Sequence, residues 1–234
     1  LGAVGAATGW RVPFWITVAM AGAALLSTVG LSTDRPVAGA PWELPWRAVL
    51  GLPTIVGTVG AVLQYGVLAF FATFAVDEWD LSEARAATLL AVGRVVSIVA
   101  KLVGGASADR IGPRASILRM ALLLAAMGAA WVLMPAGIVT YAVAAVFAGT
   151  VSSVFPVANM LAVERFGRNG MALGAYRSVQ IGIGAVAGVV IGNSPFGLRT
   201  TVFVCVLLPL VLVWFCRPVP AASGRPDQTP IAAP

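Results

Sequence analysis

The sequence contains no histidine, and only 10% of its 234 residues carry a charge. Without histidine these residues cannot form a Ser-His triad, a His-ligated zinc or haem site, or a histidine proton relay. A glycine-rich Walker loop with its lysine is also missing, so direct drive by ATP has no support. The two cysteines, Cys205 and Cys216, lie about 16 Å apart along one predicted helix, which is too far for a disulfide. We therefore expect no catalytic residues, no metal site and no cofactor.

Apolar residues fill most of the chain instead. They make up 59% of the sequence, and the mean hydropathy is +0.94, whereas soluble domains carry roughly a quarter charged residues. A helix needs about 20 mainly apolar residues to cross the hydrocarbon core of a bilayer. Seven segments fit this template: 13–31, 49–76, 86–105, 115–134, 138–162, 171–192 and 200–216. We read them as helices, because lipid offers no partner for a free backbone amide, and the chain is predicted to be an all-α, polytopic membrane protein.

Arginine residues mark alternate connections between these helices. Short loops that carry Lys and Arg stay on the cytoplasmic side of a membrane. The arginines concerned are Arg35, Arg47, Arg110, Arg114, Arg165, Arg168, Arg217 and Arg225. These connections and the C-terminal tail are therefore predicted to face the cytoplasm, in a plasma or inner membrane. Topology and contact with anionic lipid head groups account for the net charge of +6, so no nucleic-acid partner is expected.

Composition divides the chain into five parts. Residues 1–8 look like the end of a truncated helix, and 9–31 form one further transmembrane helix. Residues 32–48, which hold three prolines, are read as a cytoplasmic linker between two half-domains. Residues 49–216 contain the remaining six helices, and the proline-rich tail 217–234 is expected to be disordered. Because the chain begins with leucine rather than methionine and shows no signal peptide, we expect a fragment whose N-terminal half lies upstream.

Two of the arginine-bearing connections share a pattern of an acid, an arginine, an apolar residue and a glycine. The first is Asp109-Arg110-Ile111-Gly112 and the second is Glu164-Arg165-Phe166-Gly167. A carboxylate there can face the positive end of the next helix while the arginine reaches a phosphate or a carbonyl, and glycine permits the turn. A solvated turn that follows the positive-inside rule is one interpretation, and a latch between helices is the other.

The first hairpin can be extended to Gly105-Ala106-Ser107-Ala108-Asp109-Arg110-Ile111-Gly112-Pro113-Arg114. It then resembles the loop signature of the major facilitator superfamily, in the copy between the eighth and ninth helices. Gly9-Trp10-Arg11 with Phe14 is similar to the family's turn between helices five and six, and Phe155-Pro156 with the second hairpin resembles its passage from helix ten to helix eleven. The resemblance implies that the chain runs from the end of helix five through helix twelve. It also implies two six-helix bundles that rock about a midplane site and expose it to either side in turn.

Several polar residues lie deep in the predicted helices. Arg94 precedes Gly105 by about 16 Å, near the bilayer centre, where an arginine costs at least about 2.5–3.5 kcal/mol and should face a wet cavity or a partner. A substrate or gating role is one interpretation of Arg94, and a structural hydrogen bond to a neighbouring helix is the other. Lys101 is read as snorkelling to the interface or as a charge on the entry path. The other candidates for substrate binding, with interhelical hydrogen bonds as the alternative, are Gln64, Tyr65, Tyr176, Arg177 and Gln180.

Three glycines, Gly184, Gly188 and Gly192, recur every four residues on one predicted helix. Residues at this spacing share a helix face. A face without side chains lets a neighbouring backbone approach closely, so we expect these glycines to serve helix packing.

All nine Asp and Glu residues lie outside the middle of the predicted helices. The deep charges are thus positive, and arginine binds planar oxyanions through two parallel hydrogen bonds. We therefore expect a secondary transporter for a small solute, with an organic or inorganic anion as the favoured class. A coupled proton would need a carboxylate from the upstream half. An exporter of drugs or metabolites is the alternative. A seven-helix receptor is more remote, since the last helix has no lysine for retinal, and an intramembrane enzyme lacks an acid-base pair.

Overall fold

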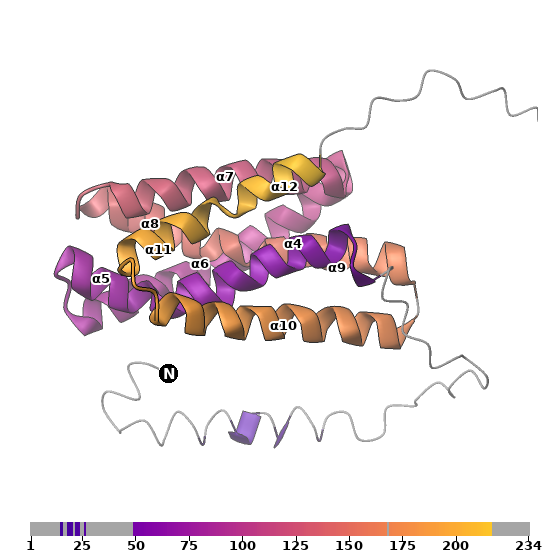
Figure 1. Cartoon of the computed structure of the whole chain (residues 1–234), viewed down its shortest axis with the longest axis horizontal. Helices are drawn as coiled ribbons and strands as arrows, with labels where there is room; N and C mark the ends of the chain where they lie inside the picture. Colours follow the sequence, from indigo (N-terminus) through magenta and orange to yellow (C-terminus); the bar gives the residue numbers. More distant parts are fainter. Residues whose placement is uncertain are drawn as a thin grey trace, which may run out of the picture.

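The structure, a computed structural model, describes residues 15, 18–20, 22–23, 26, 49–167 and 169–216. The predicted segments 1–8, 32–48 and 217–234 lie outside these residues, and so does most of the predicted helix in 9–31. The described part contains helices and no strand (Figure 1). Six helical spans within it are long and apolar enough to cross a membrane: Leu52–Trp79, Glu83–Ile111, Pro113–Leu133, Ile138–Phe166, Gly170–Gly192 and Leu198–Phe215. The prediction of an all-α, polytopic membrane protein is confirmed.

The ends of the helices differ from the predicted ends where charged residues begin. Helix α6 (Glu83–Ile111) continues six residues beyond the predicted end at 105, so Asp109 and Arg110 belong to its last turn. The first connection is reduced to Gly112, whose positive φ of 84° suits glycine. Glu164 and Arg165 likewise lie in the last turn of α9 (Val154–Phe166). The predicted hairpins were therefore too long, because hydropathy reports where the apolar core stops and not where backbone hydrogen bonding stops.

The first span, Leu52–Trp79, leaves α-helical geometry near its middle. It consists of α4 (Leu52–Ala61), a π-helical segment η1 (Val62–Gly66), a 3-10 segment η2 (Val67–Phe70) and α5 (Phe71–Trp79). Helix α10 (Gly170–Gly192) packs against the irregular part. A Cβ on Gly66 would lie only 3.1 Å from the Cβ of Ala187, so glycine allows this close approach. The sequence analysis did not predict the irregular segment.

Two further spans are interrupted where a proline follows. The fourth span divides into α8 (Ile138–Val151) and α9, with Ser152 and Ser153 between them. Pro156 has no N–H, and its ring clashes with the carbonyl four residues earlier, which is that of Ser152. The last span divides at Leu208 into α11 (Leu198–Leu207) and α12 (Pro209–Phe215), because Pro209 likewise lacks an N–H. Proline thus explains two of the three irregular spans.

Small residues set the spacing between α6 and its neighbours α8 and α9. The buried residues of α6 are Ala86, Gly93, Ser97, Gly104 and Ala108. A Cβ on Gly93 would lie 2.8 Å from the Cβ of Ala148, and one on Gly149 would lie 2.6 Å from a methyl carbon of Val96. Helices that meet through such residues associate by van der Waals packing, which operates in lipid as well as in water.

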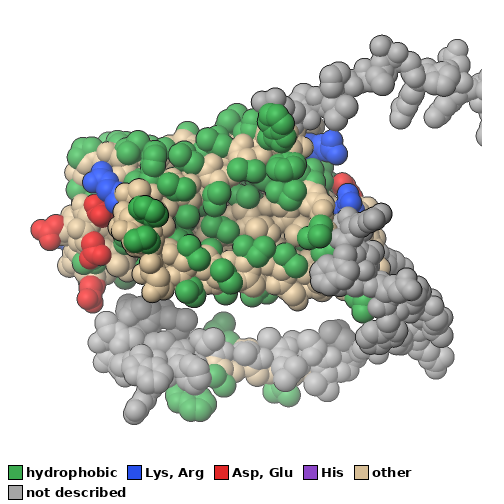
Figure 2. All heavy atoms as spheres, viewed as in Figure 1, with side chains coloured by type: hydrophobic (Ala, Val, Ile, Leu, Met, Phe, Trp, Pro, Cys, Tyr) green, Lys and Arg blue, Asp and Glu red, His purple; other side chains and the backbone are tan. Residues whose placement is uncertain are grey.

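Helix α7 (Pro113–Leu133) packs on α6, α8, α11 and α12, and its Trp131 is the centre of an aromatic cluster. The rings of Phe71, Phe74, Trp79 and Phe147 lie with their centroids 4.7 to 6.0 Å from that of Trp131. Outside this core, hydrophobic side chains cover much of the visible face of the bundle, and the charged side chains gather toward its ends (Figure 2). This distribution fits a bundle with its sides in lipid and its ends in water.

Candidate functional site

A hydrogen bond joins the irregular parts of the first and fourth spans. Gln64 lies in the π-helical segment, and Ser152 lies at the break between α8 and α9. The hydroxyl of Ser152 donates to Oε1 of Gln64 at 3.1 Å. Ser152 is buried and Gln64 is half-buried. Because π-turns occur frequently at functional sites, this mid-span junction is the first element of the candidate site.

Tyr65, the next residue, lies on the open side of this junction and is 48% exposed. Its ring packs beside that of Phe155, with centroids 6.5 Å apart. On its other side it meets α10, where a Cβ on Gly184 would lie 2.7 Å from the Tyr65 ring. The glycine row continues along the same segment, since Gly188 lies against the carbonyl of Tyr65 and Gly192 against the ring of Phe70. The three glycines therefore lie along the irregular part of the first span.

Tyr176, Arg177 and Gln180 form a polar network on α10. Tyr176 and Gln180 are each 1% exposed, whereas Arg177 is exposed. The Arg177 guanidinium donates to Oε1 of Gln180 at 3.0 Å and lies 5.8 Å from the centroid of the Tyr176 ring. The Tyr176 hydroxyl donates to Oδ1 of Asn159 on α9 at 3.4 Å. The network thus holds Arg177 on one side and reaches α9 on the other.

The amide of Gln180 occupies the space above a glycine of α4. A Cβ on Gly57 would lie 1.5 Å from Nε2 of Gln180 and 3.1 Å from the Tyr176 hydroxyl. This Nε2 is buried and has no hydrogen-bond partner among the described residues. A buried amide donor without a partner carries a desolvation cost of about 1–3 kcal/mol.

Arg94 and Lys101 lie apart from both groups. Both are exposed on α6, and neither side chain forms an ion pair or a hydrogen bond with another described residue. The ion pair found within residues 49–167 and 169–216 joins Arg199 and Glu78, at 3.5 Å, near the opposite end from Lys101. In the structure, Tyr65 contacts the glycines of α10, and Gln64 is its neighbour in the chain. Tyr176, Arg177 and Gln180 contact one another on α10. Arg94 lies on another helix, α6.

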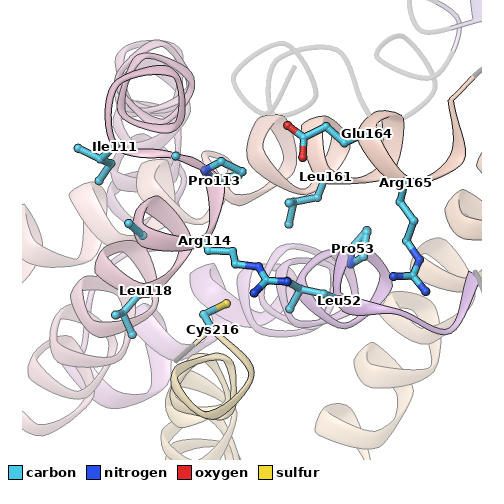
Figure 3. A pocket seen from close by; sticks show the side chains of 12 residues that line it. Leu52, Pro53, Ile111, Pro113, Arg114, Leu118, Leu161, Glu164, Arg165 and Cys216 are labelled. Carbon is cyan, nitrogen blue, oxygen red and sulfur yellow. The ribbon is translucent and has the colours of Figure 1, made fainter. Parts of the chain in front are cut away.

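The two acid-arginine motifs meet at a cavity of about 630 Å³. Arg114 lines it from the first turn of α7, Glu164 and Arg165 line it from the last turn of α9, and Cys216 lines it from the end of α12 (Figure 3). The Arg114 side chain extends toward Cys216 and Leu52, while Glu164 lies on the far side of the cavity. Burial raises the pKa of the Cys216 thiol, and the Arg114 guanidinium partly opposes that rise.

Ile111 and Gly112 of the first motif also line this cavity, whereas Asp109, Arg110 and Gly105 do not. Asp109 and Arg110 are exposed at the end of α6, and Gly105 faces open space. The two motifs thus meet through Ile111, Gly112 and Arg114 rather than through the acid of the first motif.

Three polar residues of this region were not predicted as site residues. Ser152 and Asn159 are the hydrogen-bond partners of Gln64 and Tyr176. The proximity of Ser152 to Pro156, at a depth similar to that of Gln64, was a usable signal. Arg119, an exposed arginine on α7, was overlooked because it lies close to the end of its helix.

Comparison with known proteins identifies the family of this helical bundle. A sequence model of the Major Facilitator Superfamily matches residues 1–189, which include four of the six spans and most of α10. Comparison with curated proteins and with solved structures gave no significant match. The family match covers well over half of the chain and agrees with the apolar helical bundle. The chain therefore belongs to the Major Facilitator Superfamily, a family of multi-pass membrane transporters.

Proposed function

We propose that the protein is a secondary active transporter that moves a small solute by alternating access, and that the described bundle forms one wall of the transport path. The solute is an organic or inorganic anion. The protein lies in a plasma or inner membrane with the ends that carry Arg110 and Arg165 toward the cytoplasm, as the positive-inside rule favours. The family match supports the transporter class, and the following features support the finer assignments.

The observation that carries the proposal is the mid-span junction of Gln64 and Ser152. Substrate sites of secondary transporters lie near the bilayer midplane, where helices are interrupted and polar groups become available. Both spans are irregular at this junction, and the exposed ring of Tyr65 lies beside it. Gln64 and Tyr65 would thus contact the solute, while Ser152 orients the amide of Gln64.

The charges of the described residues support an anion. Every described Asp and Glu lies within about one turn of a helix end, so the deep cations have no carboxylate beside them. Arg94 is exposed without a protein partner among the described residues, and Arg177 is anchored through Gln180 with part of its guanidinium left available. A planar guanidinium can bind a carboxylate or phosphate through two parallel hydrogen bonds.

A drug or metabolite exporter is the second candidate, and one observation favours it. The exposed ring of Tyr65 beside Phe155 offers an aromatic surface on which a flat apolar solute would pack. Such an exporter would bind cations or neutral compounds, and its response to Arg94 substitution separates it from an anion transporter.

Coupling to a proton or another ion would require a group outside the described residues, because no described carboxylate lies in mid-span. The cavity between Arg114 and Glu164 would serve as the latch at one end of the path. Closing and opening of that end would then alter the surroundings of Arg114 while the mid-span junction stays intact.

The test is ligand-induced thermal stabilisation of the complete protein in detergent with a panel of small anions, neutral solutes and cations. We expect stabilisation by anions alone, and we expect Arg94→Ala to abolish it. Arg199→Ala is the matched control, since this exposed arginine lies at the other end of the bundle in an ion pair with Glu78. Stabilisation by cations or neutral solutes that survives Arg94→Ala would contradict the anion assignment and favour the exporter.

A further inference from the structure

An open groove of about 360 Å³ runs along one flank of α6, between α6, α7 and α8. Apolar side chains line most of its length, among them Val96 and Val99 of α6, Leu123 of α7 and Val146 of α8. Val99 and Leu123 are 61% and 49% exposed, so the groove opens to the surroundings of the bundle. Exposed apolar surface of this kind on a membrane protein is covered by lipid chains or by another protein surface.

One end of the groove is polar and cationic. Ser107 of α6 and Arg119 of α7 line it, and neither side chain has a partner among the described residues. Ser107 lies about 6 Å before the end of α6, and Arg119 lies about 9 Å after the start of α7. Both groups therefore sit at about the level where lipid phosphates and glycerol groups meet the hydrocarbon core.

Exposed apolar residues continue along α6 beyond this groove, toward the other end of the helix. Val92, Val96 and Val99 are spaced by four and three residues and so share a flank of the helix. Val92 also lines a second groove, of about 550 Å³, which contains Arg85. The distance along α6 from Arg85 to Ser107 is about 33 Å, close to the thickness of the hydrocarbon core. The flank is thus apolar over one membrane thickness and has an arginine near each end.

The two ends differ in the charges around them. Asp77, Glu78, Asp80 and Glu83 lie within eight residues of Arg85 in the sequence, whereas Arg110 and Arg114 outnumber Asp109 near Arg119. An anionic head group is attracted to a surface with excess positive charge and repelled by excess acid. The Arg119 end is therefore the end that selects an anionic lipid.

We propose that this flank binds an anionic phospholipid, whose phosphate contacts Arg119 and Ser107 and whose acyl chain lies along Val99 and Leu123. A snorkelling arginine without a counter-ion among the described residues and an apolar channel that leads away from it match the two parts of such a lipid. The groove shares no lining residue with the cavity between Arg114 and Glu164, and it reaches the break between α8 and α9 through Ser153 rather than through Ser152 or Gln64.

The experiment is native mass spectrometry of the complete, delipidated protein after addition of equal amounts of phosphatidylglycerol and phosphatidylcholine. We expect phosphatidylglycerol to be retained preferentially, and Arg119→Gln to lower its occupancy about fivefold, as for one basic side chain near an anionic head group. Arg85→Gln is the matched control and should leave that occupancy unchanged. Equal retention of the two lipids, or wild-type retention by Arg119→Gln, would overturn the proposal.

A second variant keeps the proposal testable should Arg119→Gln fail to fold. Val103 lines the groove and is 61% exposed, so Val103→Trp fills the channel without entering the core. It should reduce retention of phosphatidylglycerol while the arginine is still present. Wild-type retention of phosphatidylglycerol by Val103→Trp would also overturn the proposal. So would a lack of bound lipid in the wild-type protein, as expected if another protein segment or copy covers the groove.

Discussion

Ser152 donates a hydrogen bond to Gln64 at 3.1 Å, and this bond connects two membrane spans at points where both depart from α-helical geometry. The two residues are 88 positions apart in the sequence, so the bond depends on how the helices pack. It links a segment with an exposed tyrosine to a helix break caused by proline. The bond places a polar contact between two spans near the middle of the bundle.

The first prediction concerns this bond. Gln64→Leu removes the acceptor at nearly unchanged volume, and Ser152→Ala removes the donor. In membrane proteins such bonds contribute on average about 0.6 kcal/mol, so each variant should lose little thermal stability. A double-mutant cycle of thermal unfolding in detergent should give a coupling free energy of that size. Gln64→Leu should nevertheless lower the rate of solute transport strongly, although it changes stability little. Transport at the wild-type rate in Gln64→Leu would remove Gln64 from the path.

The second prediction concerns the contact between Gly57 and Gln180. Gly57→Ala places a methyl group 1.5 Å from the present position of Nε2, so the Gln180 amide must move and release Arg177. We expect Gly57→Ala and Gln180→Ala to have similar transport defects, and the double variant to be no worse than either. Gly174→Ala is the control, because its Cβ would meet open space. Additive defects in the double variant would contradict the shared mechanism.

The third prediction concerns the packing of α6 on α8. Gly149→Val would force a larger side chain against Val96 and the carbonyl of Gly93, which lies 3.0 Å from an added Cβ. Overpacking of this kind costs about 1–3 kcal/mol, which thermal unfolding in detergent should detect. Gly182→Val, on the open face of α10, should change stability far less. Equal effects of the two substitutions would mean that the helices are not in the close contact described.

The fourth prediction concerns the thiol of Cys216 beside Arg114. Burial raises the pKa of Cys216 and Arg114 lowers it, so Arg114→Gln should raise the pKa further. Because the thiolate is the reactive form, the pH profile of maleimide labelling should shift to higher pH and labelling near neutral pH should slow. The measurement uses a Cys205→Ser background, with Arg110→Gln as the control. A profile that Arg114→Gln leaves in place would show that the two groups do not interact.

The membrane-spanning helices could be predicted from the sequence because hydropathy alone identifies them. Hydropathy over about 20 residues identifies membrane helices, and all six spans in the described residues were predicted. It failed where hydrogen bonding outlasts hydropathy, as at Asp109 and Arg110, which continue α6. The breaks beside Pro156 and Pro209 were not predicted, although both prolines are visible in the sequence and proline disrupts the interior of a helix.

The candidate site was only partly accessible from the sequence. Gln64, Tyr176 and Gln180 were proposed from the sequence because a polar side chain deep in an apolar helix is unusual. Their partners Ser152, Asn159 and Gly57 could not be assigned, since each pairing depends on which helix faces are in contact. The composition of the π-helical segment Val62–Gly66 is not distinctive, so the sequence did not predict it. The structure shows that this segment packs against α10.

The central claim is that Arg94 and the mid-span junction form one wall of an anion transport path. The most direct measurement is counterflow of the best stabilising anion in proteoliposomes that contain the complete protein, with Arg94→Ala, Arg94→Lys and Arg199→Ala compared at equal reconstitution. The account predicts robust anion counterflow in the wild type and Arg199→Ala, loss in Arg94→Ala, and partial recovery in Arg94→Lys because the charge but not the planar fork is restored. Undiminished counterflow in Arg94→Ala would contradict it.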